Sequence, residues 1–255
     1  MDTIKKLIRC DLIMLLHSGK AAVIAPVVLL LLFCGIMILA GASFVAGTAF
    51  VMFGVSLVSL LLNTEKTSGC TPLFGILPAE RQTVAAARFV LCGGILTAAL
   101  ILCALCMEIT LAVMEQDTDA AQLFISLFGL DPERVSANTF HRFGFYGCFM
   151  VSLIITGTSL RSYFKNGLGS RKNSLLFLIL KGYLVFMACT ALFILLPSTK
   201  IPFISTAIFY IYSLISAMLQ PAGGYPAVIM LLAFGYSWFV YCGVSAAIDY
   251  EKREL

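Results

Sequence analysis

The feature that most constrains this chain is a series of long apolar stretches in which polar and apolar residues do not alternate. The first of them, residues 21–64, contains no Asp, Glu, Lys, Arg or His. Helical stretches of about 20 apolar residues match the thickness of a bilayer, where each backbone group must find a partner within its own helix. The chain is therefore predicted to be an all-α, polytopic membrane protein.

Composition supports this class. The chain is 60% hydrophobic and 12% charged, whereas a soluble domain carries roughly a quarter charged residues. The net charge of +4 is spread over several loops, so no nucleic-acid partner is expected, because such binding needs a concentrated basic face. Most of the nine cysteines stand inside apolar stretches, which predicts buried thiols rather than a disulfide framework.

Six transmembrane helices are predicted within a membrane domain at residues 21–248. Their ranges are 21–40, 42–62, 89–113, 143–160, 175–196 and 226–248. The first two spans are separated only by a turn near Gly41, so they should form a tight helical hairpin. Ser43 and Gly47, four residues apart, are expected to allow these two helices to approach closely.

Residues 1–20 precede the first span and have an amphipathic helical pattern. The apolar positions on one face are Ile4, Leu7, Ile8, Leu12 and Leu15. The basic residues at other positions are Lys5, Lys6 and Arg9. This pattern predicts an interfacial helix whose aliphatic face lies at the acyl boundary and whose cations lie among anionic headgroups. The alternative is a cytosolic extension of the first span.

The distribution of basic residues predicts the orientation in the membrane. The segments 1–20, 63–88, 161–174 and 249–255 hold 13 of the 17 Lys and Arg residues, so they are expected in the cytoplasm. Both termini, including the tail 249–255, are then cytoplasmic, and the acidic loop 114–142 is extracellular.

Residues 201–219 carry no charge and would fit either a seventh span or a re-entrant segment. Because prolines bracket them, we favour an outer re-entrant segment at 197–225.

The sequence offers little chemistry. It has two histidines and no nucleotide-binding glycine loop or hydrolase motif, so we expect no enzymatic activity and no catalytic, cofactor-binding or metal site. Any ATP would be bound by a partner chain. Two charges fall within predicted spans, Glu108 and Lys181, and each is a possible intramembrane functional residue. They occupy opposite leaflets, so they are not expected to pair.

The most informative segment is the predicted cytoplasmic loop 63–88. It contains the pair Glu65 and Lys66, then Leu77 and Pro78, and then Arg81, Val84 and Arg88. Proline is favourable in the first turn of a helix, and the last three residues recur at helical spacing. A helix is therefore expected to run from about residue 78 into the third span. Such a helix would pass motion between a soluble partner and the membrane domain; the alternative is a solvated loop with basic anchors.

In this loop the sequence resembles the permease subunits of ABC-2 type transporters, specifically a small six-span bacterial family. The matching residues are Glu65, Lys66, Leu77, Pro78, Arg81 and Val84. Arg88 stands where the family usually has lysine, and the aromatic residue that commonly follows the Glu-Lys pair is missing.

The resemblance implies a function and an assembly. Residues 1–20 would be a connecting helix, and residues 65–88 would dock on a separate ABC ATP-binding subunit. Two permeases, either a homodimer or a pair with a related permease, would form an exporter in the bacterial inner membrane. The substrate would be hydrophobic or amphipathic, and 20 phenylalanines suit a peptide such as those handled by cytolytic-peptide exporters. The alternative function is a membrane-embedded sensor or assembly factor that binds a cytosolic partner without transport.

Overall fold

A computed structural model of the chain describes residues 2–17, 20–39, 43–68, 80–113, 137–166 and 224–252. These ranges are helical apart from a few terminal positions and contain no strand, so the all-α class is confirmed for this part of the chain. The helices are α1 (Asp2–His17), α2 (Lys20–Leu39), α3 (Ser43–Ser68), α5 (Arg81–Val113), α7 (Ala137–Asn166) and α10 (Tyr225–Glu251).

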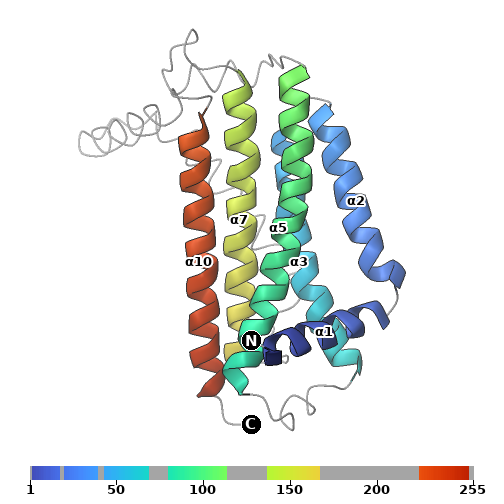
Figure 1. Ribbon diagram of the computed structural model, residues 1–255, viewed down its shortest axis with the longest axis vertical. Helices are drawn as coiled ribbons and strands as arrows, with labels where there is room; N and C mark the ends of the chain where they lie inside the picture. The colour runs from blue at the N-terminus through green and yellow to red at the C-terminus, as the bar shows by residue number, and fades with distance from the viewer. Residues whose placement is uncertain are drawn as a thin grey trace, which may run out of the picture.

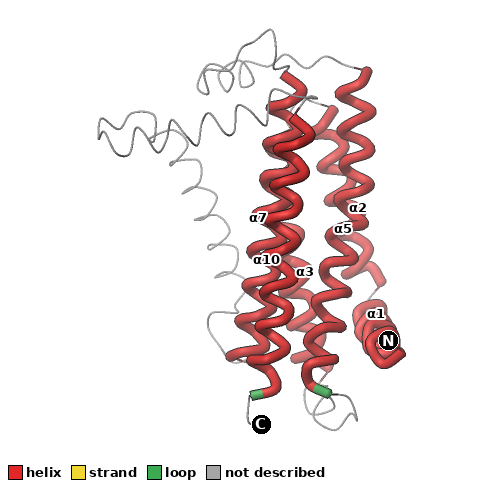
Figure 2. The backbone as a smooth tube through the Cα atoms, turned by 60° about the vertical axis from the view of Figure 1, so that its left-hand side comes forward, coloured by secondary structure: helices red, strands yellow, loops and turns green. Residues whose placement is uncertain are grey.

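Five of the described helices run along the long axis of the bundle, and α1 lies across them near one end (Figure 1, Figure 2). We call this the α1 end and the opposite one the far end. Helices α2 and α5 run from the α1 end to the far end, whereas α3, α7 and α10 run back (Figure 1). Helices α7 and α10 therefore lie side by side in the same direction, and the start of α1 and the end of α10 share one end of the bundle.

Three stretches of the described helices are long and apolar enough to cross a membrane. They are Arg81–Ala112, His141–Asn166 and Tyr225–Glu251. Helices α2 and α3 add shorter apolar segments, Val28–Ile38 and Ala46–Leu61. The predicted span 175–196 and residues 197–223 of the predicted re-entrant segment lie outside the described residues.

Two helices extend beyond the predicted spans 89–113 and 143–160. Helix α5 begins at Arg81 and runs without interruption through the predicted start of the third span at Phe89. Helix α7 begins at Ala137, so His141 and Arg142 are helical rather than part of a loop. Hydropathy could not place this start, because it assigns the polar residues His141 and Arg142 to the loop. In the structure His141 is buried and Arg142 is paired with Glu108 of α5, so the bundle accommodates both.

Helices α3 and α7 approach each other closely, and glycine makes this possible. A Cβ atom added at Gly54 would lie 2.5 Å from Oγ1 of Thr156 and 2.6 Å from Oγ of Ser152. The Ser152 hydroxyl donates a hydrogen bond of 2.7 Å to the Phe50 carbonyl on α3. Gly47 likewise faces Cys148 of α7. The expectation that Gly47 serves the contact between the first two spans is therefore wrong.

Helix α1 packs its aliphatic side against the rest of the chain. Leu7 is buried with Val84 and Ala87 of α5, and Tyr250 of α10 packs against the same cluster. Partly buried Ile4 and Ile8 join it. Leu7 is therefore covered by α5 rather than inserted into lipid as predicted, while Ile4 and Ile8 are only half-buried.

Candidate coupling site

The predicted coupling residues gather at the α1 end of the bundle. Glu65 and Lys66 belong to the last turns of α3, while their side chains, together with residues 77 and 78, lie outside the described part. Helix α5 starts at Arg81, and the Glu80 carbonyl accepts hydrogen bonds from the amides of Thr83 at 2.9 Å and Val84 at 3.3 Å. The end of α3 and the start of α5 thus lie at the same end of the molecule (Figure 1).

Val84 is buried, as is Arg88, among the three predicted coupling residues whose side chains the structure describes. It is 3% exposed and packs against Leu7 of α1. In this structure its apolar surface therefore secures α1 to α5 and is not presented to a partner.

Arg88 is the second buried residue of the set. Its Nε lies 3.7 Å from Oδ2 of Asp11, with both side chains 5% exposed. One terminal nitrogen donates a hydrogen bond of 3.2 Å to the Tyr163 hydroxyl. The guanidinium also lies over the rings of Tyr163 and Phe164, at 5.6 and 6.0 Å from their centroids. One cation therefore joins α1, α5 and α7, and the acid that it contacts belongs to its own chain.

The rim of the α1 end carries further polar contacts. Nε2 of Gln82 donates a hydrogen bond of 2.5 Å to Oε2 of Glu251, which ties α5 to α10. Nε of Arg161 lies 3.4 Å from Oδ2 of Asp249, which ties α7 to α10. Glu80 and Gln82 are exposed and Arg81 is half-buried. Among the described coupling residues, the accessible surface is therefore the first turn of α5.

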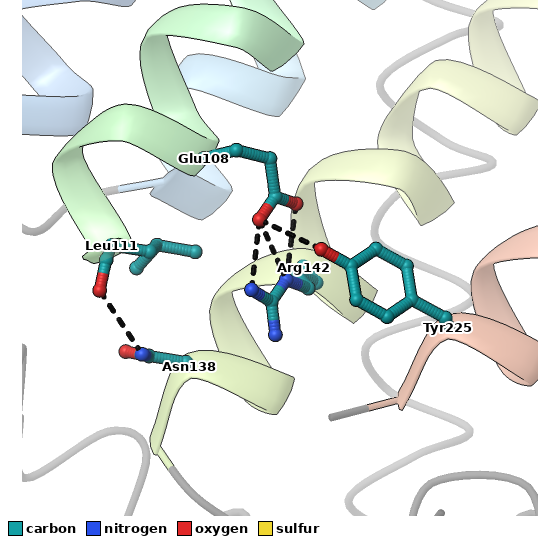
Figure 3. A network of polar contacts seen from close by, with 5 residues as sticks. All are labelled: Glu108, Leu111, Asn138, Arg142 and Tyr225. Atoms are coloured by element: carbon teal, nitrogen blue, oxygen red, sulfur yellow. Dashed lines mark hydrogen bonds and ion pairs between the residues drawn. The ribbon is translucent and has the colours of Figure 1, made fainter. Parts of the chain in front are cut away.

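A second polar cluster, around Glu108, joins α5, α7 and α10 at the far end (Figure 3). Nε of Arg142 donates to both carboxylate oxygens of Glu108, at 3.0 and 3.1 Å, and Nη2 donates to Oε2 at 2.8 Å. The Tyr225 hydroxyl donates to the same Oε2 at 3.1 Å. The Arg142 guanidinium lies 4.7 Å from the centroid of the Tyr225 ring.

The local backbone positions Tyr225 for this cluster. Gly224 has a φ of 83°, in the left-handed region that side chains disfavour. Tyr225 begins α10 directly after this residue, and Pro226 follows in the first turn, where its missing N–H has no cost. The phenol thus reaches Glu108 from the first residue of α10.

Sequence reasoning selected Glu108 but not its partners. Arg142 falls in the predicted loop 114–142, and Tyr225 falls in the predicted re-entrant segment 197–225. Asp11 and Tyr163, the partners of Arg88, were also missed. Asp11 could have been found, because it is an acid one turn after Leu7 on the apolar side of α1, where an uncompensated charge would be costly.

Two further site predictions concern Lys181 and the expected lack of a metal site. Lys181 lies outside the described residues. Within the described ranges, no group of three or more His, Cys, Asp or Glu side chains is placed to hold a metal ion.

The chain matches no protein-family model, no curated protein and no solved structure in the comparisons made. Fold and hydropathy define the described part of the chain as all-helical, with three helices there that are suited to crossing a membrane.

Proposed function

We propose that this chain is the permease subunit of an ATP-driven exporter of the ABC-2 type. The observation that carries the proposal is helix α5, which runs unbroken from an accessible first turn at Arg81 to Glu108 and beyond. At 1.5 Å per residue its 33 residues span about 50 Å. Movement imposed on its first turn would reach the far end of the bundle through one rigid element.

Contacts at both ends suit this role. Arg88 links α5 to α1 and α7, and Glu108 links it to α7 and α10. A force applied to Arg81 would therefore move a connected group of helices rather than one helix alone. In this proposal Arg81, with Glu80 and Gln82 beside it, contacts the partner, whereas Val84 and Arg88 carry the displacement into the membrane domain.

The proposed topology has six spans with both termini in the cytoplasm. Helices α7 and α10 run in the same direction, which requires an odd number of crossings between them and supports one span at 175–196. The basic residues of α1 and of the ends of α7 and α10 lie at the α1 end, and the positive-inside tendency makes this end cytoplasmic. The bacterial inner membrane is the proposed location.

The proposed assembly has two copies of the chain, or one copy and a related permease, with two ATP-binding subunits that hydrolyse ATP. Two copies are proposed because six helices would enclose only half of a route for a large amphipathic substrate, such as a peptide. A sensor or assembly factor would use the same first turn of α5 without moving a substrate. Substrate-dependent stimulation of hydrolysis separates the two functions.

The deciding experiment co-expresses the chain with an ATP-binding subunit encoded by a neighbouring reading frame. We expect co-purification in a two-to-two complex whose ATP hydrolysis increases with an amphipathic peptide. Arg81→Glu should weaken this complex or uncouple hydrolysis from export, whereas Lys165→Glu, an exposed charge reversal at the end of α7, should preserve both. Equal behaviour of the two variants would remove Arg81 from the coupling contact, and a complex insensitive to every substrate would favour the sensor.

A further inference from the structure

Helix α1 exposes a cationic face that no contact within the described part of the chain accounts for. Lys5, Lys6 and Arg9 are all exposed, whereas Leu7 and Asp11 on the opposite side are buried. Asp11 faces Arg88, so the acid of this helix is directed away from the three cations. The exposed side of α1 therefore presents concentrated positive charge.

The spacing of these cations favours an anionic ligand. Lys5 and Arg9 are four residues apart, where two like charges on a helix repel each other. An anion between the side chains would relieve this repulsion.

The neighbouring exposed residues indicate which kind of anion fits. Leu12 and Ile13, one turn further along the same exposed side, are 41% and 54% exposed. Helix α1 lies across the long helices, and α5 and α10 extend past it at the α1 end (Figure 1, Figure 2). The cationic face is thus on the flank of the bundle, set back from its tip, with apolar side chains beside it.

We propose that the exposed face of α1 binds an anionic phospholipid, with its phosphate between Lys5, Lys6 and Arg9 and its acyl chains against Leu12 and Ile13. An acidic soluble protein fits less well, because the flank of a membrane-crossing bundle faces lipid and the exposed Leu12 and Ile13 suit acyl chains. The inference rests on the membrane-embedded part of the proposed function and is independent of ATP and export.

The test measures binding of a phosphatidylglycerol, POPG, to the purified full-length chain in neutral detergent, by native mass spectrometry with POPC as reference. Lys5→Gln/Arg9→Gln is compared with Lys165→Gln/Lys252→Gln, which removes the same charge from exposed residues at the same end. A cation near an anionic lipid contributes about 1 kcal/mol, or about fivefold. The Kd for POPG should therefore rise about 25-fold in the α1 variant and less than about twofold in the control.

A charge-preserving variant, Lys5→Arg/Arg9→Lys, is the control for misfolding at these two positions. It should retain POPG affinity. The proposal is overturned if POPG binds no tighter than POPC, if the control variant loses as much affinity, or if the charge-preserving variant loses it too. It is also overturned if the α1 variant keeps POPG but loses a co-purifying ATP-binding subunit, because the face would then belong to that protein. Failure to find any such subunit would refute the proposed exporter and leave the lipid site standing.

Discussion

Removing the carboxylate of Asp11 should destabilise the bundle strongly, because it takes an acid away from the buried cation of Arg88. Both side chains are 5% exposed, and breaking a buried ion pair from one side costs about 3–5 kcal/mol. Two features place Asp11→Leu near the lower limit, at about 3 kcal/mol. The 3.7 Å separation is long for a charge-assisted hydrogen bond, and Arg88 keeps its contacts with Tyr163.

A double-mutant cycle isolates the interaction. Arg88→Met should cost a similar amount, whereas Asp11→Leu/Arg88→Met replaces the pair with apolar side chains and should lie within about 1 kcal/mol of the parent chain. The matched control is Asp249→Leu, which breaks the Arg161 pair whose side chains are 35% and 25% exposed. Its expected cost is below about 1 kcal/mol.

The assay is reversible unfolding in mixed micelles, followed by far-UV circular dichroism as the mole fraction of denaturing detergent rises. Single costs of about 3 kcal/mol each and a double cost of about 1 kcal/mol give an expected coupling energy between Asp11 and Arg88 of about 5 kcal/mol. The reasoning fails if Asp11→Leu lowers the free energy of unfolding by no more than Asp249→Leu does. It also fails if the loss in the double variant equals the sum of the losses in its two single variants.

Other variants test the remaining features of the bundle. Gly54→Ala should destabilise it by about 1–3 kcal/mol because the added Cβ meets side chains of α7, whereas Gly94→Ala, with nothing within 4 Å, should be neutral or stabilising in the same unfolding assay. Glu108→Gln should cost about 1–2 kcal/mol through weaker hydrogen bonds to Arg142, and an unchanged unfolding midpoint would contradict the contacts drawn in Figure 3. A single cysteine at Asp117 should react with impermeant maleimide in intact cells, and reaction only after lysis would reverse the proposed orientation.

The coupling residues show how far sequence reasoning reached. Their helical spacing and the proline before them predicted a helix that continues into the third span, and α5 has this continuity from Arg81 onward. The same reasoning treated Val84 and Arg88 as surface residues for a partner. Spacing gives the face of a helix on which a residue lies, but it does not say which other helix covers that face.

Sequence alone determined the all-α class, because apolar stretches of membrane length leave the backbone no other way to satisfy its hydrogen bonds. It also singled out Glu108, since a charge among apolar residues is costly wherever the helix packs. Only the tertiary structure decided the partners: Arg142 and Tyr225 for Glu108, and Asp11 for Arg88. These contacts join helices that are distant in the chain, and their geometry depends on the directions and offsets at which the helices pack, which hydropathy and spacing do not encode.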